Sequence, residues 1–244
     1  ASATESATAT PGTTGAPVAG GSIRVATQKP AGPLDPIGMQ DLGTYGVVSQ
    51  CFEFLCTLGP TGDIEPGLAE EWTPNEDGTV WTFKLRQGVK WQADGSPFTS
   101  ADVAASFDRY KKIGVDRSIL EPVEKWETPD ASTFVLRLKE ARPTFIEQLS
   151  AFTVPVVIIP AENVDAAAQQ LPIIGTGPFQ LEEFRADSHV KLKRYEGYKP
   201  NTKYEQRTGF GGYKVACVDT VTYRIVTELL GAAEEGLVRA RRGV

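Results

Sequence analysis

Residues that could perform chemistry are few in this sequence. The single histidine, His189, follows Asp187 and Ser188, so a Ser-His-Asp hydrolase could in principle use it. No G-x-S-x-G nucleophile motif accompanies it, and a lone histidine of this kind is usually an ordinary surface residue. Neighbouring side chains point away from each other in a helix or strand, so adjacent acidic pairs form no local acid/base pair. These pairs are Glu70-Glu71, Glu182-Glu183 and Glu234-Glu235. We predict no catalytic residue.

Motifs for cofactors and metals are also missing from the sequence. Neither G-x-G-x-x-G nor G-x-x-x-x-G-K-[ST] occurs, so no phosphate-cradling loop is expected. Cys51, Cys56 and Cys217 match no metal-ligand spacing such as C-x2-C. If residues 51–56 were helical, the first two Cα atoms would lie roughly 8 to 9 Å apart, too far for an unstrained disulfide. We predict small buried thiols, no cofactor and no metal.

Composition restricts the class of protein further. The chain has 244 residues, of which 41% are hydrophobic and 23% charged, as in a globular protein. No apolar run approaches the roughly 18 to 20 residues that a membrane-spanning helix needs. A net charge of −6 argues against non-specific nucleic-acid binding, and the one dense basic cluster is Arg239, Arg241 and Arg242.

The N-terminal segment is compositionally distinct. Residues 1–20 are almost entirely Ala, Thr, Ser, Gly and Pro, so they cannot bury enough apolar surface to offset the entropy of ordering. We expect a disordered tether. Such a segment is typical of the region directly after a removed signal sequence, so export is expected, and a lipid anchor is left open.

The remaining chain predicts mixed secondary structure. We expect strands at 22–26, 80–86, 126–138 (two strands joined by a turn), 156–159, 190–193 and 221–225, from alternating or continuous apolar residues. We expect helices at 43–58, 144–151 and 228–242, helical turns at 66–72, and a helix that starts with a capping box at Thr99 and Asp102. Gly175-Thr176-Gly177-Pro178 predicts a sharp turn with positive φ at one glycine. The four tryptophans are interpreted mainly as core residues. No regular strand-helix alternation exists, which favours an α/β or α+β protein built as two regions.

Several long segments resemble, in family order, the extracytoplasmic solute-binding proteins of family 5, which serve peptide and nickel ABC importers. The matching stretches are GGSIRVA (20–26), LDP (34–36), FEFL (52–55), PGLAEEW (66–72), DGTVWTFKLRQGVKW (77–91), DGSPFTSADVAASFDRY (94–110), STFVLRLKEARPTF (132–145), GTGPFQLEEF (175–184) and VTYRIV (221–226). The resemblance covers roughly residues 20–226, and the block from Pro66 to Tyr110 is the most specific part.

The resemblance implies an α/β fold of the periplasmic-binding-protein type II, a two-lobed Venus flytrap. Carried onto this chain, residues 21–43 and 165–244 would form part of the first lobe, and residues 44–164 an inserted subdomain. Family members are about twice as long, and Thr227 to Val244 fits their pattern poorly. We therefore expect a C-terminally truncated member without the second lobe.

The resemblance also implies the function: extracytoplasmic binding of a solute, most simply a peptide, for delivery to a membrane permease, with no chemistry performed. The segment after LDP would line the ligand cleft. The candidate ligand-binding residues are therefore Met39, Gln40, Asp41, Leu42, Thr44 and Tyr45. Extended peptides bind through main-chain hydrogen bonds, and Leu42 is the preferred backbone partner. An ordinary loop with buried Met and Leu is the alternative interpretation of this segment.

Three further expectations concern the whole chain: its affinity for solute, its oligomeric state and its function. Without the second wall of the cleft, binding would be impaired. A complete member would be monomeric, whereas a truncated one could self-associate through exposed apolar surface. A carboxylate-dependent hydrolase and an interaction or folding remnant without activity remain the competing functions.

Overall fold

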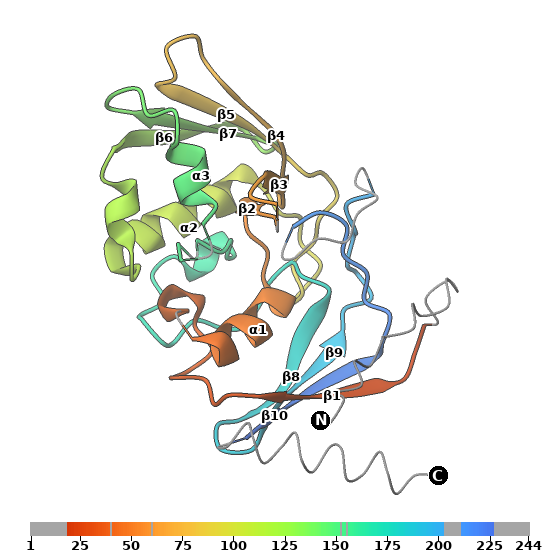
Figure 1. Ribbon diagram of the computed structural model, residues 1–244. Helices are drawn as coiled ribbons and strands as arrows, with labels where there is room; N and C mark the ends of the chain where they lie inside the picture. The colour runs from red at the N-terminus through yellow and green to blue at the C-terminus, as the bar shows by residue number, and fades with distance from the viewer. Residues whose placement is uncertain are drawn as a thin grey trace, which may run out of the picture.

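The computed structural model describes residues 19–39, 41–59, 61–151, 153–154, 156–202 and 211–226. Within these residues the chain forms two four-stranded sheets and one two-stranded sheet. Figure 1 shows one four-stranded sheet at the bottom of the molecule and the other at the top, with helices between and beside them. The expected tether and the expected helix at 228–242 lie outside the described residues.

The first sheet has the order β1-β10-β9-β8. β1 (Ser22–Thr27) pairs in parallel with β10 (Thr220–Ile225), which is antiparallel to β9 (His189–Arg194), which is antiparallel to β8 (Phe179–Arg185). α1 (Leu42–Cys51) packs against one face of this sheet (Figure 1), and the Tyr223 hydroxyl donates to the Gly46 carbonyl at 3.2 Å. Strands from the two ends of the described chain therefore share one sheet.

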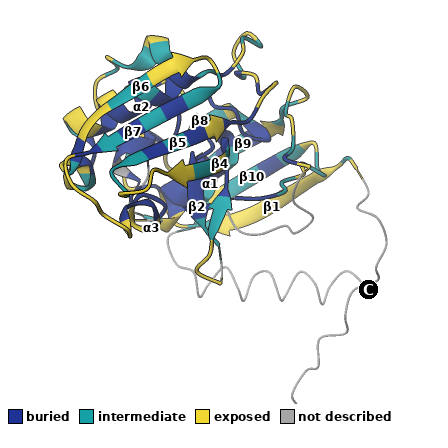
Figure 2. Ribbon diagram, turned by 90° about the horizontal axis from the view of Figure 1, so that it is seen from above, coloured by how far each residue is buried: buried dark blue, intermediate teal, exposed yellow. Residues whose placement is uncertain are grey.

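The second sheet is fully antiparallel, with the order β4-β5-β7-β6. Its strands are β4 (Ala69–Pro74), β5 (Val80–Leu85), β6 (Val123–Asp130) and β7 (Thr133–Leu138). α2 (Ser100–Ile113) covers the inner face, where Phe107 lies 5.1 Å from Phe134 between ring centroids. Buried residues alternate with more exposed ones along the central strands β5 and β7, whereas β4 and β6 at the sheet edges are mostly exposed or half-buried (Figure 2).

Short elements connect the two sheets. β2 (Cys56–Leu58) and β3 (Ile64–Pro66) form a small antiparallel pair, and α3 (Phe145–Leu149) follows β7. Three 3-10 helices occupy Pro36–Gly38 (η1), Arg117–Leu120 (η2) and Ala161–Asn163 (η3). The predicted short helix at 144–151 and the predicted strands at 22–26, 80–86, 126–138, 190–193 and 221–225 are confirmed.

The predicted start of α2 is also confirmed. The Asp102 carboxylate accepts hydrogen bonds from the Thr99 amide at 2.7 Å and the Thr99 hydroxyl at 3.2 Å. Its other oxygen accepts from the Ala161 amide at 2.9 Å. One buried carboxylate thus satisfies a helix start and also fixes a distant loop.

Three predicted elements are wrong. The helix expected over 43–58 ends at Cys51, since Phe52 is extended and residues 52–55 are buried on all sides, which leaves no polar face for a surface helix. The helical turns expected at 66–72 are instead the end of β3, a bend at residues 67–68 and the start of β4. The Leu68 amide donates to the Phe54 carbonyl at 2.8 Å, so this backbone bonds to a distant segment and not within a helix. The run 156–159 is buried but forms only an isolated bridge between Val157 and Phe54.

The expected positive φ in the G-T-G-P segment is also wrong. Neither Gly175 nor Gly177 has a positive φ. Both glycines instead permit a close chain crossing: a Cβ on Gly175 would lie 1.9 Å from the Cys51 carbonyl oxygen, and one on Gly177 would lie 2.5 Å from that of Gln50. Glycine is needed at both positions because any side chain would collide with the backbone that crosses there.

The described residues pack into two hydrophobic cores. One lies between α1 and the first sheet and includes Val48, Phe52 and Leu192. The other lies between α2 and the second sheet, where Trp81 and Trp91 are buried and Trp72 and Trp126 pack at the margin, as predicted for core tryptophans. Cys51 and Cys56 are buried free thiols, and Cys217 is partly exposed. The domain boundaries at residues 44 and 164 stay a prediction.

Candidate functional site

The segment predicted to line a ligand cleft surrounds the start of α1. Met39 and Tyr45 are buried in the hydrophobic core between α1 and the first sheet. Leu42, the first residue of α1, is 79% exposed. Gln40 lies outside the described residues. Asp41 and Thr44 line a hollow, so the structure brings these two predicted residues together at one surface.

Asp41 has a defined local role. One carboxylate oxygen accepts a hydrogen bond from the Thr44 amide at 2.8 Å, and the other accepts from the Thr44 hydroxyl at 2.7 Å. The residue is therefore the N-cap of α1 and places a negative charge at the positive end of the helix. This arrangement fixes the helix start at the edge of the hollow.

The hollow has a volume of about 300 Å³, near the lower limit for small-molecule sites. Its wall combines apolar side chains with a few polar ones from three separate parts of the chain: Ala31, Gly32, Pro33, Asp35, Ile37, Asp41, Thr44, Ile113, Val115, Ala168 and Gln169. Apolar surface with a small number of fixed polar groups is the usual composition of a small-solute site.

A buried ion pair supports the floor of the hollow. Asp35 and Arg109 form two hydrogen bonds, of 2.8 and 3.2 Å, and both side chains are nearly inaccessible to solvent. The Gln169 amide donates to the same carboxylate at 2.7 Å, and Gln169 has a φ of 65°. Asp35 therefore holds three parts of the wall together, a role that sequence reasoning did not assign to it.

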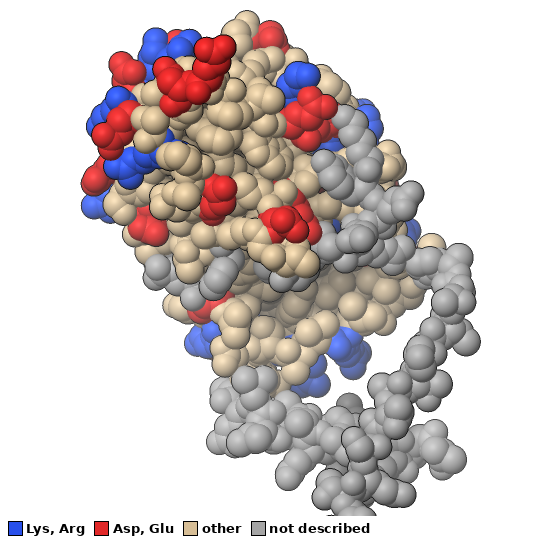
Figure 3. All heavy atoms as spheres, turned by 45° about the horizontal axis from the view of Figure 1, so that its top comes forward, with Lys and Arg blue, Asp and Glu red and all other residues tan. Residues whose placement is uncertain are grey.

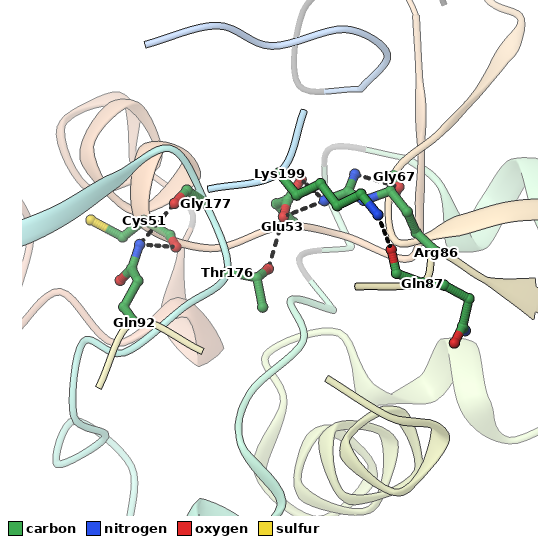
Figure 4. Close-up of polar contacts among 9 residues, drawn as sticks. All are labelled: Cys51, Glu53, Gly67, Arg86, Gln87, Gln92, Thr176, Gly177 and Lys199. Carbon is green, nitrogen blue, oxygen red and sulfur yellow. Dashed lines mark hydrogen bonds and ion pairs between the residues drawn. The ribbon is translucent and has the colours of Figure 1, made fainter. Parts of the chain in front are cut away.

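A second polar cluster lies where the chain crosses between the two cores (Figure 4). The Gln92 side-chain amide donates to the carbonyls of Cys51, Gly177 and Phe179 at 3.3, 2.9 and 2.7 Å. Its oxygen accepts from the Gly175 amide at 3.1 Å. One side chain from the segment before α2 thus joins the end of α1 to the start of β8.

Beside Gln92 is a buried ion pair, also drawn in Figure 4. Arg86 donates to both oxygens of Glu53 at 3.0 and 2.9 Å and to the Gly67 carbonyl at 3.1 Å, and the Thr176 hydroxyl donates to Glu53 at 2.9 Å. Burial alone would lower the pKa of Arg86, but the Glu53 carboxylate holds that pKa above its ordinary value. Both charges are compensated, so the pair holds the crossing in one geometry.

Within the described ranges, no group of three or more His, Cys, Asp or Glu residues is arranged to hold a metal ion. The same part of the chain contains no helix with the length and apolar character needed to cross a membrane. His189 contacts the Ser188 hydroxyl at 2.9 Å and Glu183 at 3.2 Å, whereas Asp187 pairs with Lys29 at 2.6 Å. The Ser-His-Asp set considered from the sequence is therefore not formed.

Comparison with known sequences identifies relatives. The Glutathione-binding protein GsiB of Salmonella typhi is 30% identical over 200 residues, which cover 80% of this chain and 36% of the relative. The protein of the same name from Escherichia coli K12 is 32% identical over 170 residues, 68% of this chain and 33% of the relative. The chain thus spans about a third of the length of these curated relatives.

Solved structures show the same fold. The binding protein AgaA from A. tumefacien R10, in complex with agropinic acid, matches with a TM-score of 0.71 and 28% identity over 88% of this chain and 41% of its own. The oligopeptide-binding protein AppA of Bacillus subtilis, in complex with a nonapeptide, matches with a TM-score of 0.71 and 21% identity over 93% and 44%. The second likeness concerns the fold alone.

The match to a family model covers most of the chain. Residues 63–236 match the model described as bacterial extracellular solute-binding proteins, family 5, middle region. This range contains the second sheet, α2, the G-T-G-P crossing and three of the four strands of the first sheet. The chain therefore belongs to family 5 of the bacterial extracellular solute-binding proteins.

Proposed function

We propose that this chain binds a peptide or a similar small solute outside the cytoplasm and passes it to an ABC permease. The match of residues 63–236 to the family 5 model carries this proposal. A curated relative is named a glutathione-binding protein, and the similar solved structure of AgaA holds agropinic acid, which supports a peptide or similar small solute. In this proposal the protein performs no chemistry and binds its ligand reversibly.

The hollow at the start of α1 is the proposed solute contact. It lies beside Asp41 and Thr44, and the exposed Leu42 backbone is within the same turn. A hollow with one open side supplies only part of the contacts that usually bury 70–90% of a small ligand. We therefore propose that the 244 residues alone bind solute weakly, with a dissociation constant above about 10 µM, or about −7 kcal/mol.

Native mass spectrometry and calorimetry test this proposal. The purified chain should appear without retained ligand in native mass spectrometry, because weakly held solute dissociates on dilution, and calorimetry should show binding of glutathione or a mixture of short peptides at high micromolar to millimolar concentration. Val115→Trp places a large ring in the hollow and should weaken this binding at least tenfold. Val215→Trp is the matched control, because Val115 and Val215 are similarly exposed, 41% and 39%, and only Val115 lines the hollow.

Two results would contradict the proposal. Equal weakening by Val115→Trp and Val215→Trp would place the solute elsewhere, and a dissociation constant below about 10 µM would show that these residues form a sufficient site. Hydrolysis of an ester or glycoside panel would instead support the competing hydrolase.

We also propose a monomer anchored or released outside the membrane, which fractionation of the producing cell and light scattering would test.

A further inference from the structure

The face of the first sheet that points away from α1 carries a regular set of cations. Ile23, Val221 and Leu192 are register partners across three strands and so share one face, on which Val221 and Leu192 pack into the core beside α1. The next residue along each strand must point to the opposite face. That row contains Arg24 on β1, Thr222 on β10 and Lys191 on β9.

A second row continues this surface. Arg224, two residues after Thr222, is the register partner of His189 on β9 and of Ala26 on β1. Neighbouring strands lie about 4.7 to 4.9 Å apart, and side chains on one face of a strand repeat every second residue, about 6.6 Å along it. Arg24 and Arg224 are therefore diagonal neighbours across the β1-β10 pair, with Thr222 beside both.

The polar side chains of these two rows line a hollow of about 330 Å³. Its lining residues are Arg24, Ser188, His189, Lys191, Thr222 and Arg224, so the wall has three permanent cations, one histidine, two hydroxyls and no carboxylate. Lys191 is paired with Glu182 at 2.9 Å, and His189 contacts Glu183 at 3.2 Å. Within the part of the chain that the structure describes, Arg24 and Arg224 form no ion pair, which leaves two uncompensated guanidinium groups at one place.

The second sheet provides a contrast. Its exposed cations are matched by neighbouring acids, as in Lys84–Glu71 at 2.9 Å and Lys125–Glu127 at 2.8 Å. Figure 3 shows acidic and basic side chains intermixed over the end of the molecule that carries this sheet. The excess of positive charge on the first sheet is therefore a local feature and is not the general pattern of a protein with a net charge of −6.

We propose that this hollow binds a small polyvalent oxyanion, of which inorganic phosphate is the simplest example. Arg24 and Arg224 present planar forks of N–H donors suited to an oxyanion from two sides. Thr222, the register partner of Arg24, adds a hydroxyl donor, and Lys191 and Ser188 also line the hollow. The site is separate from the proposed solute hollow, because the two share no residue and α1 lies on the other face of the sheet.

Isothermal titration with inorganic phosphate in low-chloride buffer tests the site on the full 244-residue chain. We expect submillimolar binding that sulfate displaces and that weakens with rising ionic strength. The double variant Arg24→Gln and Arg224→Gln should weaken it at least tenfold. Lys84→Gln removes an exposed cation from the second sheet and should change the dissociation constant less than twofold.

The double variant should keep its fold, because both arginines are exposed and unpaired within the described residues, and its thermal midpoint checks this. Absence of binding at about 10 mM phosphate, or equal weakening by Lys84→Gln, would overturn the proposal. Binding of a polyglutamate peptide or of phosphatidylglycerol vesicles without phosphate binding would also overturn it, since the face would then recognise an acidic chain or a membrane. Solute binding at α1 is measured separately, so each proposal can fail alone.

Discussion

At the scale of single residues, the Glu53–Arg86 pair has the largest predicted effect on stability. Both side chains are 4% exposed, so Glu53→Gln leaves a buried guanidinium without its counter-charge. Removing one partner of a buried pair costs about 3 to 5 kcal/mol, whereas an exposed pair contributes about 1 kcal/mol or less. For Glu53→Gln we therefore expect the free energy of unfolding, measured with urea, to fall by about 3 to 5 kcal/mol.

Glu71→Gln is the matched control for this experiment. It breaks the exposed pair with Lys84, where the side chains are 57% and 71% exposed. The expected change is below about 1 kcal/mol. Similar losses in the two variants would show that burial does not determine the contribution of these pairs.

The buried thiols predict sensitivity to alkaline pH. Burial raises the pKa of Cys51 to about 12 and that of Cys56 to about 11, the latter despite a hydrogen bond with Ser150. Thiols in the unfolded chain lose their protons near pH 9, while the folded thiols keep theirs. Rising pH above about 9 therefore favours the unfolded chain, by up to about 1.4 kcal/mol per pH unit for each thiol.

Urea unfolding between about pH 8 and pH 11 measures this effect. Cys51→Ala should make the alkaline loss of stability shallower. Cys217→Ala changes a partly exposed thiol and should leave the slope as it is. An unchanged slope in Cys51→Ala would mean that other groups cause the alkaline loss.

At the scale of elements, the G-T-G-P crossing depends on the absence of a side chain. A methyl group on Gly175 would lie 1.9 Å from the Cys51 carbonyl oxygen, so Gly175→Ala must displace backbone on one side of the crossing. We expect a loss of about 2 to 3 kcal/mol, in the upper part of the range known for overpacked sites. Thermal and urea unfolding provide the measurement.

Gly46→Ala gives the opposite expectation within the neighbouring helix. Gly46 lies inside α1, and an added Cβ meets nothing within 4 Å. Alanine is better than glycine in a helix by about 1 kcal/mol, so this variant should be neutral or more stable. A destabilised Gly46→Ala together with a stable Gly175→Ala would refute the packing described for the crossing.

The elements also show how far the sequence could predict the fold. Strands such as β5 and β7 were predictable because Trp81, Phe83, Phe134 and Leu136 alternate with more exposed residues. Residues 52–55 and 66–69 were not, because every residue in these two short runs is buried and no period distinguishes helix from strand there. The glycines of the crossing were noticed, but their close approach to Cys51 is a contact between segments far apart in the sequence.

The candidate site was predictable only in part for the same reason. Asp41 and Thr44 were found through the family resemblance of a local segment. The other part of the hollow is lined by residues far apart in the sequence, such as Asp35, Val115 and Gln169. Their segments meet only in the folded chain, where Asp35 binds the buried Arg109 and the Gln169 amide. The sole local signal for this arrangement was an arginine inside an otherwise amphipathic helix, which is not specific.

At the scale of the whole molecule, two packed units meet at a few polar contacts. The first sheet with α1 and the second sheet with α2 have separate hydrophobic cores, and the segments at residues 52–55, 86–92 and 175–179 pass between them. The Gln92 side chain alone makes four hydrogen bonds with backbone groups of this junction, and Figure 4 shows the two with Cys51 and Gly177. Because backbone groups left buried without partners cost about 1 to 3 kcal/mol each, this side chain should couple the two units.

Hydrogen exchange of the Gln92→Ala variant would measure that coupling. We expect amides of β8 and β9 to exchange at least tenfold faster, while amides of α2 change little, because the variant loosens the first unit from the second. Gln87→Ala is the control: the Gln87 side chain donates to the Leu85 carbonyl at 3.0 Å, within the second unit, and its loss should leave β8 protected. If Gln92→Ala accelerated exchange equally in both units, the molecule would open as one cooperative body, and the junction would not be its weakest connection.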